Sequence, residues 1–290
     1  MKNINKLFYT ILACTIIFSA SNLKAQDTQD SKIGLTVGLD YISNYIYRSQ
    51  YYYFGNQLNG GMFAPYASYD VFDTGLSMGI KGEVNESWIW NNNDELQNMG
   101  MENWNSLNFN INYMYHLKEA VIFNLGSWYG RYKTLQQSSY SRNISYFDFY
   151  FSAAIDALPL TPMLAVTYTY LTDKDYAHGN SGNYKNGDFY VQLGISHSFE
   201  LDDETYLDLD AVVGWYDKNA YDGRESLGST KSADISDIDL SAGLTTMFGI
   251  ISLSTSFHYV IVPGTQYKYF MGNIKDIHKY YAKFGVSCSI

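Results

Sequence analysis

Residues 107–129 read LNFNINYMYHLKEAVIFNLGSWY, and this stretch decides the predicted fold. Apolar and polar side chains alternate from Leu107 to Leu117, a period of two that gives one extended strand an apolar face and a polar face. Lys118-Glu119-Ala120 predicts a tight turn, and the alternation resumes from Val121 to Tyr129. Each run is near the ~9–11 residues that a tilted strand needs to cross a bilayer, against ~5–6 in a typical soluble strand. The stretch therefore predicts a transmembrane β-hairpin.

The same alternation recurs along the chain and predicts twelve strands, the first over 33–48 and the last over 280–290. Their connections are alternately long and short, with six long polar loops and five short turns. An even number of strands with this loop asymmetry is typical of outer-membrane barrels. We therefore predict an all-β fold, a transmembrane up-and-down antiparallel β-barrel of 12 strands with periplasmic N- and C-termini.

Aromatic residues concentrate near the ends of the predicted strands and on their apolar face. The chain contains 29 tyrosines and 16 phenylalanines. Two aromatic girdles flanking an apolar band are what the two interfaces of a bilayer select. The predicted girdle on the loop side contains Tyr45, Tyr47, Trp88, Trp104, Tyr168, Phe189, Trp215, Tyr259 and Tyr280, and the girdle on the turn side contains Tyr69, Tyr115, Phe123 and Phe199.

Residues 1–25 have the features of a secretory signal peptide. Lys2 and Lys6 precede an apolar run over 7–18, and small and polar residues lead to Ala25. We predict cleavage after Ala25, which leaves residues 26–290 as a single outer-membrane barrel domain. The sequence thus predicts export to the cell outer membrane of a Gram-negative bacterium.

Charge and cysteine content exclude several functions. The formal net charge is −10, and removal of the signal peptide, which contains three lysines and no acid, makes the chain more acidic. Such a surface argues against nucleic acid as a partner. Only Cys288 remains after cleavage, so we expect no intramolecular disulfide and no thiolate metal site. The histidines lack metal-ligand spacing, and we predict no metal and no cofactor.

One family resemblance supports the barrel prediction. The first strand contains DYISNYIYRS over 40–49, and hairpins are predicted around 160–170, 188–199 and 207–216. In these stretches the chain resembles the TorF-type porin family over most of its predicted mature length. The position after Arg48 is Ser49, where the family usually has glycine. The resemblance implies a secreted precursor, a one-domain outer-membrane barrel and a channel-like role, and it names no solute.

The polar face of the strands predicts the lining of the barrel. Acidic residues outnumber basic ones there, and acidic rings favour cations in a water-filled pore. We therefore predict an outer-membrane porin-like diffusion channel for small hydrophilic solutes that weakly prefers cations. The predicted pore-lining residues are Asp40, Arg48, Lys81, Glu83, Asp148, Asp156, Asp208, Asp210, Asp237, Asp239, His258 and Lys283.

Two other functions fit a barrel of this kind. Salt pairs such as Asp40 with Lys283 across the closing seam would fill the lumen of a plugged, structural barrel. Alternatively, the long loops 172–187 and 217–233 could act as the binding part of a surface adhesin or antigen. Twelve strands give a bore between the filled and the open cases, so strand number alone does not decide among these functions.

An outer-membrane hydrolase is the third alternative. A turn at Phe248-Gly249 would place Asp239 opposite His258, with Ser256 on the same face, and these residue types form catalytic triads. A serine on the same strand is expected to lie parallel to the histidine rather than to point at it. We therefore predict no catalytic residues and no enzyme activity.

The expected partners follow from the predicted location. They are the lipid bilayer of the outer membrane, the barrel-assembly machinery during insertion, and small hydrophilic solutes or cations in the lumen. The sequence does not predict an oligomeric state.

Overall fold

The computed structural model describes residues 34–43, 46–47, 50–51, 61–71, 74–85, 104–118, 120–134, 143–172, 188–216, 234–261, 263 and 278–290. The predicted signal peptide, Tyr45, Arg48, Trp88 and most residues of the six long loops lie outside these ranges. The side chains of Tyr47 and Trp104 also lie outside the description.

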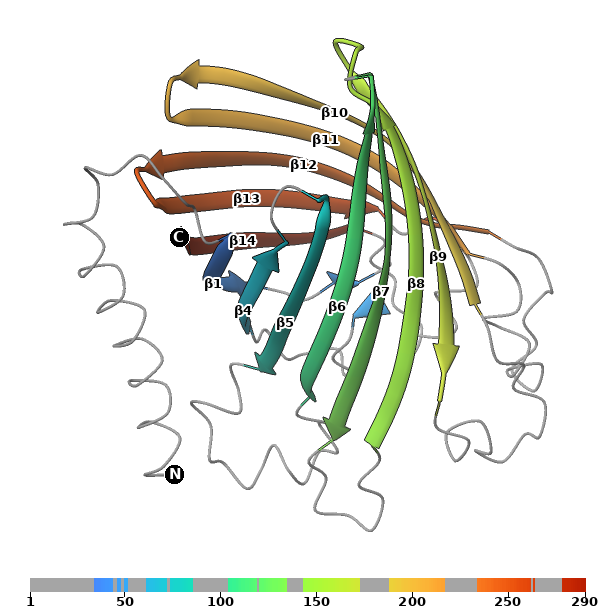
Figure 1. The fold of residues 1–290 in the computed structure, drawn as a ribbon. Coiled ribbons are helices and arrows are strands. Elements are labelled where there is room, and N and C mark those ends of the chain that lie inside the picture. The colour runs from blue at the N-terminus through green and yellow to red at the C-terminus, as the bar shows by residue number, and fades with distance from the viewer. Residues whose placement is uncertain are drawn as a thin grey trace.

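Twelve strands form one closed antiparallel barrel, as the alternation predicts (Figure 1). Each strand pairs with its neighbours in the chain, and the first pairs with the last. The barrel strands are β1 (Leu35–Ile42), β4 (Met62–Asp70), β5 (Leu76–Asn85), β6 (Trp104–Leu117), β7 (Val121–Thr134), β8 (Asn143–Ile155), β9 (Thr161–Leu171), β10 (Asp188–Asp202), β11 (Thr205–Tyr216), β12 (Asp234–Phe248), β13 (Ile251–Ile261) and β14 (His278–Ser289).

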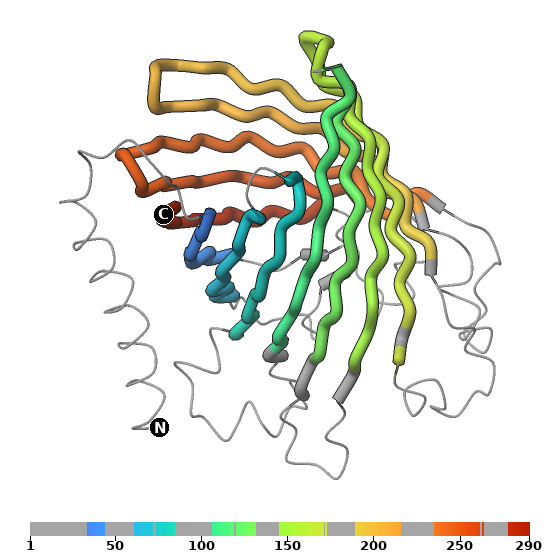
Figure 2. Tube along the Cα trace, in the orientation of Figure 1, coloured from blue at the N-terminus to red at the C-terminus, as the bar shows by residue number. Residues whose placement is uncertain are grey.

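The barrel closes where β1 lies between β4 and β14 (Figure 2). Leu39 pairs with Val286 on one side and with Pro65 on the other. At the end of this seam the Leu35 N–H donates to the Ile290 carbonyl at 3.2 Å, and the Ile290 N–H donates to the Leu35 carbonyl at 2.8 Å. The first and last strands therefore leave no open edge along their paired length.

The prediction that the first strand covers 33–48 is wrong at its far end, because β1 ends at Ile42. The Ser43 N–H still donates to the Ala282 carbonyl at 2.8 Å, but the Ala282 N–H donates to the Ser43 hydroxyl at 2.8 Å. A side chain thus replaces the backbone acceptor and ends the ladder. Beyond it, β2 (Ile46–Tyr47) and β3 (Gln50–Tyr51) form a separate two-stranded sheet.

The turn between β12 and β13 differs from the predicted Phe248-Gly249. Phe248 pairs with Ile251, so the turn residues are Gly249 and Ile250. Gly249 has a φ of 61°, a conformation that glycine adopts without steric cost. The register is therefore shifted relative to the prediction, but each side chain stays on its predicted face because the shift in pairing is an even number of residues.

The outer face of the barrel is apolar and exposed. Leu193, Leu125 and Phe257 are 61%, 59% and 53% exposed, and many other large apolar side chains share this face. A soluble monomer rarely exposes apolar area on this scale. The described residues contain no helix long and apolar enough to cross a membrane.

Aromatic side chains pair across neighbouring strands near the loop ends of the barrel. The ring centroids are 4.8–5.1 Å apart in four such pairs, and the paired positions lie directly opposite each other in the ladders. These contacts confirm that aromatic residues gather at this end of the barrel. The pairs are Tyr41 with Phe63, Tyr129 with Phe147, Tyr168 with Phe189, and Tyr259 with Tyr280.

Adjacent residues on β10 test the assignment of the two faces. Leu193→Arg places a charge on the apolar outer face and is expected to lower the free energy of unfolding by ~2–4 kcal/mol. Gln192→Arg places the same charge on the inner face, beside Ala165 and Gly214, and should cost far less. Urea titrations of the protein refolded into lipid vesicles would measure both values. Equal losses in the free energy of unfolding for the two variants would contradict the assignment of Leu193 to the outer face and Gln192 to the inner face.

Candidate functional site: the inner wall of the barrel

Of the twelve predicted pore-lining residues, eleven lie in the described part of the chain, and Arg48 does not. Asp156 lies in the turn between β8 and β9, where it is exposed and accepts from the Thr161 hydroxyl at 3.4 Å. It therefore stands at the rim of the barrel rather than on its wall. The other ten lie on strands: Asp40, Lys81, Glu83, Asp148, Asp208, Asp210, Asp237, Asp239, His258 and Lys283.

Two ion pairs neutralise part of the predicted acidic lining. The Lys283 ammonium lies 3.0 Å from an Asp40 carboxylate oxygen, which confirms the predicted pair across the seam. The Lys81 ammonium lies 3.4 Å from an oxygen of Glu83, two residues away on β5. Both carboxylates are largely buried, and a carboxylate in such a position requires a compensating partner.

A chain of hydrogen bonds extends from Glu83 across the inner wall to β8. The Ser106 hydroxyl donates to Glu83 at 2.7 Å, the Asn108 amide donates to the Ser106 oxygen at 2.9 Å, and the Tyr146 hydroxyl donates to the Asn108 oxygen at 3.2 Å. Asn108 is only 2% exposed. A fully connected chain of this kind holds each side chain in one orientation.

Asp208 and Asp210 lie in a different environment on β11. Their neighbours on β12 are Gly243 and Ser241, and the Ser241 hydroxyl donates to Asp210 at 3.1 Å. Neither carboxylate forms an ion pair with a lysine or arginine among the described residues. These two acids are therefore not neutralised by the described part of the wall.

A β-bulge in the ladder between β11 and β12 brings two hydroxyl groups to the carboxylate of Asp237. The register shifts between Gly214 and Trp215, so Ser236 is an extra residue and both it and Asp237 are buried. The Tyr190 hydroxyl contacts the two carboxylate oxygens of Asp237 at 3.1 and 3.0 Å, and the Ser236 hydroxyl donates to the same carboxylate. Sequence alternation identifies Asp237 but not the bulge.

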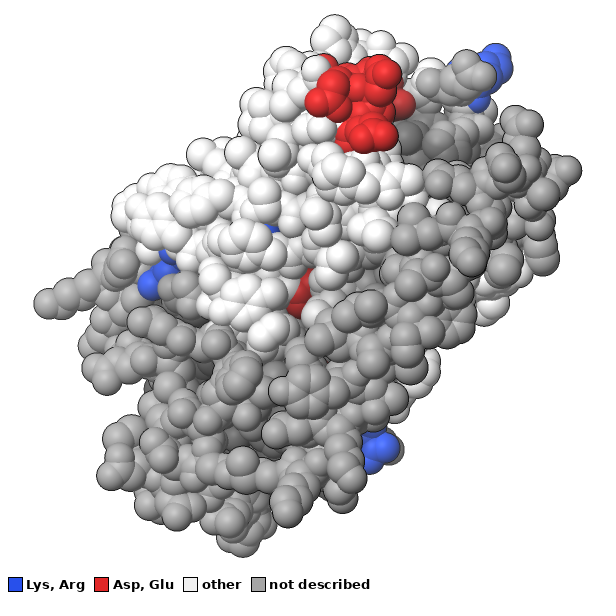
Figure 3. All heavy atoms as spheres, turned by 90° about the vertical axis from the view of Figure 1, so that its left-hand side faces the viewer, with Lys and Arg blue, Asp and Glu red and all other residues white. Residues whose placement is uncertain are grey.

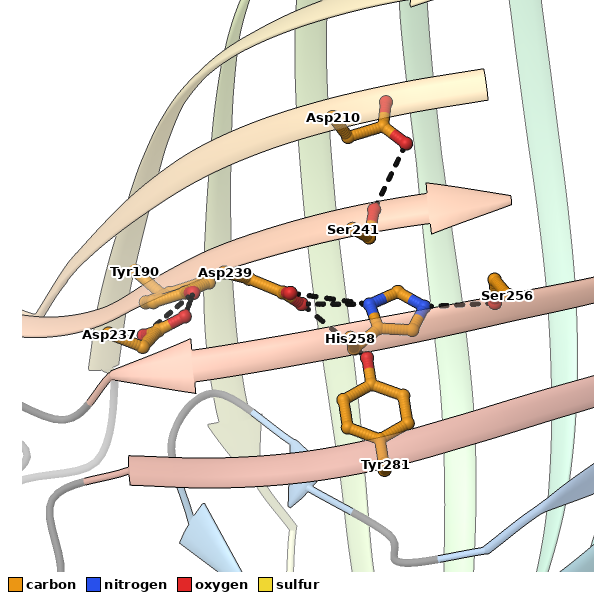
Figure 4. Close-up of polar contacts among 8 residues, drawn as sticks. All are labelled: Tyr190, Asp210, Asp237, Asp239, Ser241, Ser256, His258 and Tyr281. Atoms are coloured by element: carbon orange, nitrogen blue, oxygen red, sulfur yellow. Dashed lines mark hydrogen bonds and ion pairs between the residues drawn. The ribbon is translucent and has the colours of Figure 1, made fainter. Parts of the chain in front are cut away.

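Asp239, His258 and Ser256 are connected in the order of a catalytic triad (Figure 4). His258 Nδ1 lies 3.2 Å from an oxygen of Asp239, and His258 Nε2 lies 3.0 Å from the Ser256 hydroxyl. The expectation that the serine lies parallel to the histidine is therefore wrong. Asp239 reaches His258 diagonally, because the residue opposite His258 on β12 is Ser241.

Tyr281 holds the histidine ring from the neighbouring strand β14. Its ring stacks on that of His258 with centroids 4.2 Å apart and an interplanar angle of 7°, and its hydroxyl lies 3.4 Å from Asp239 (Figure 4). The histidine therefore has a fixed orientation between a carboxylate, a hydroxyl and an aromatic ring.

In the described part of the chain, the backbone beside Ser256 offers this group no free donor for acyl transfer. An oxyanion hole needs donors aimed at the developing charge, and these are most often backbone N–H groups. Ser256 lies in the middle of β13, whose backbone is paired with β12 on one side and β14 on the other. Its amides are therefore committed to the ladders. The described residues also contain no cluster of three or more His, Cys, Asp or Glu side chains that could hold a metal ion.

Tyrosines lying across glycines are the feature of the wall that sequence reasoning missed. The Tyr150 ring lies over Gly126 and its hydroxyl donates to Asn112, two strands away, at 2.8 Å. Tyr146 lies over Gly130 in the same way. An aromatic ring covering a glycine protects the exposed backbone of the strand. The signal in the sequence is an inward glycine next to an inward tyrosine on the neighbouring strand.

Comparison with known proteins supports the fold. No protein-family model and no curated protein matches the chain. The structure is similar to the NanC porin, with a TM-score of 0.51 and 12% identity, covering 88% of this chain and 100% of that one. An outer membrane channel from Pseudomonas putida F1 is also similar, with a TM-score of 0.49 and 12% identity, covering 91% of this chain and 98% of that one. Outer membrane phospholipase A from Escherichia coli has a TM-score of 0.42 and 10% identity, covering 91% of this chain and 95% of that one.

The fold and its apolar outer face define a β-barrel of the outer-membrane type. Its twelve antiparallel strands close on themselves, and the solved structure of highest TM-score above is that of a porin. At this identity the similarity establishes the fold alone. The resemblance to the TorF-type porin family is not tested by these comparisons and stays a prediction.

The packing of tyrosine on glycine can be tested with two glycines of the inner wall. In Gly126→Ala the new methyl group overlaps the Tyr150 ring, so we expect a loss of about 1–3 kcal/mol in the free energy of unfolding. Gly243→Ala is the control, because its methyl group would meet no atom closer than 3.5 Å. It should be neutral or stabilising by up to ~1 kcal/mol. Similar urea unfolding curves for both variants would contradict this role for Gly126.

Proposed function

We propose that this protein is an outer-membrane diffusion channel for small hydrophilic solutes with a weak preference for cations. The observation that supports this proposal most is the pair of carboxylates on β11, Asp208 and Asp210. Their cross-strand neighbours on the inner face are serines and a glycine, which leave space in front of them. In a narrow tube with a low-dielectric wall, such charges raise the local concentration of cations.

The ion pairs of the wall explain why the preference is expected to be weak. Lys283 offsets Asp40, and Lys81 offsets Glu83, so these acids contribute little net charge to the lumen. A barrel of twelve strands also has an intermediate bore, since eight strands enclose mainly side chains and sixteen enclose an open channel. The expected pore is therefore modest in both width and selectivity.

Exposed acidic residues at the end of the barrel with the short turns also favour the entry of cations. Figure 3 shows the side of the molecule that lies on the left in Figure 1, and acidic residues gather there in one patch. The turn between β10 and β11 provides Asp202, Asp203 and Glu204, all exposed, and Glu200 precedes it. The Glu204 N–H donates to Asp202 at 3.0 Å and orders the turn. Negative charge at a mouth steers cations toward the lumen.

We also propose how the protein reaches the outer membrane and how it is oriented there. The chain is exported through a signal peptide, residues 1–25, and inserted by the barrel-assembly machinery. The short turns and both termini then lie in the periplasm, and the long loops face outward. The proposal includes no enzyme activity, since Ser256 has no backbone amide left to serve as an oxyanion donor.

Opposite shifts in selectivity are expected from two variants. In Asp208→Asn/Asp210→Asn the reversal potential in a KCl gradient should move toward zero. In Gln192→Glu it should move away from zero, because the isosteric change adds a carboxylate to the inner face opposite Ala165 and Gly214. Both shifts should be largest below ~0.1 M salt, where the Debye length exceeds ~10 Å.

Planar bilayer recordings of the refolded protein would measure the reversal potentials. Well-folded protein without single-channel current would contradict the channel, and anion preference in the unmodified protein would contradict only the account of its selectivity.

The proposed lack of enzyme activity has its own test. A fluorophosphonate probe should leave the protein unlabelled, because attack by Ser256 would generate an oxyanion with no backbone donor beside it. Intact mass spectrometry of the folded protein, with Ser256→Ala as the comparison, would detect the adduct. A mass increase that depends on Ser256 would contradict the prediction and identify a nucleophilic serine.

A further inference from the structure

We infer that the inner wall formed by β6, β7 and β8 is a binding track for a neutral oligosaccharide. This inference rests on the proposed function, because it names the class of solute that the channel takes. It depends on features of the wall that lie opposite the acidic strands. In the closed order of twelve strands, β6 and β12 are six positions apart, on opposite sides of the barrel.

Aromatic side chains on this wall are held flat rather than projecting into the lumen. Tyr150 lies over Gly126 and its hydroxyl donates to Asn112 at 2.8 Å. Trp128 occupies the next inward position of β7 after Gly126, opposite Asn110 on β6. Four residues along β8, Tyr146 repeats the arrangement over Gly130.

Amide groups accompany these rings along the whole wall. The inward positions of β6 include Asn108, Asn110 and Asn112, one every second residue. Asn112 accepts from Tyr150 through its oxygen, which fixes the amide and leaves its two N–H donors available in the described part of the wall. Asn110 lies over Gly79 on the neighbouring strand β5. An amide provides both donors and acceptors, as the hydroxyls of a sugar require.

Charge is nearly absent from the wall. Among the described inner-face residues of β6–β8, Asp148 is the only carboxylate, and there is no lysine or arginine. Asp148 is 6% exposed and accepts from the Thr169 hydroxyl on β9. A buried and hydrogen-bonded carboxylate offers little to a solute in the lumen. The wall is therefore suited to a neutral ligand.

Rings and amides together select a carbohydrate rather than another neutral solute. The face of an aromatic ring carries negative charge density and attracts the polarised C–H groups on the face of a sugar ring. The amides bind the hydroxyls at its edge. Tyr146 and Tyr150 are four residues apart, or about 13 Å along the strand, farther than one sugar ring extends. The length of the track therefore indicates an oligosaccharide.

The fixed geometry contributes to binding as well. Each ring is held by a hydrogen bond to a side chain two strands away, so little conformational freedom is lost when a ligand stacks on it. A purely apolar solute would use the rings and leave the amides without ligand partners. The amides thus favour sugars over aromatic or aliphatic compounds.

Block of single-channel KCl current by maltohexaose and by cellohexaose tests the inference. We expect at least one of them to interrupt the current in a concentration-dependent way, and Trp128→Ala to weaken that block by tenfold or more. The KCl current of Trp128→Ala should be larger, because a side chain leaves the lumen. Trp215→Ala, which removes a tryptophan from the outer face, is the matched control and should retain the block.

Polyethylene glycol of similar mass provides a second control. If the polymer blocks as strongly as the sugars, or if Trp128→Ala is blocked like the unmodified channel, the wall has no specific affinity and the inference is wrong. Conducting channels that neither sugar blocks would also overturn it and leave the proposed channel intact. A channel that passes no KCl contradicts the proposed function instead, and titration of tryptophan fluorescence in micelles with the same sugars then decides whether the wall binds them.

Discussion

The structure depends on one requirement, that every backbone N–H and C=O group inside a bilayer be paired within the protein. A sheet meets it only when its first and last strands pair, and here β1 and β14 do so from Thr36 to Ile42. Closure fixes the division of each strand into an apolar outer face and a sheltered inner face. The ion pairs and hydrogen-bond networks of the strands lie on that inner face because the outer face must remain apolar.

Once the barrel is closed, its inner wall is constrained by side-chain hydrogen bonds between strands. Tyrosine hydroxyls reach acceptors two strands away, and glycines make room for the rings that cross the strand between them. The result is an ordered lining divided by chemistry, with amides and aromatic rings on β6–β8 and carboxylates on β11 and β12. Both proposals about function depend on this division.

Sequence alternation predicted much of this structure because a period of two records directly which side chains face lipid. Strand number, antiparallel order and the inward position of residues such as Asp208 and Lys283 follow from it. It could not predict where β1 ends, since that depends on the Ser43 hydroxyl, or the bulge that buries Ser236. Both features interrupt the alternation at a single residue, and the alternation of the surrounding residues does not indicate where such an interruption occurs.

Contacts between side chains were harder to foresee than the faces they occupy. The pair of Asp40 and Lys283 was predicted because both residues lie on the strands that must meet. The contact between Ser256 and His258 was not, because residues two apart on a strand point the same way and only rotation of the side chains joins them. The division of the lumen has a further consequence for the proposed channel: Asp208 and Asp210 would make the β11 side of the lumen negative relative to the wall of β6–β8. A dipolar solute is then expected to turn its positive end toward β11 before it moves along the axis.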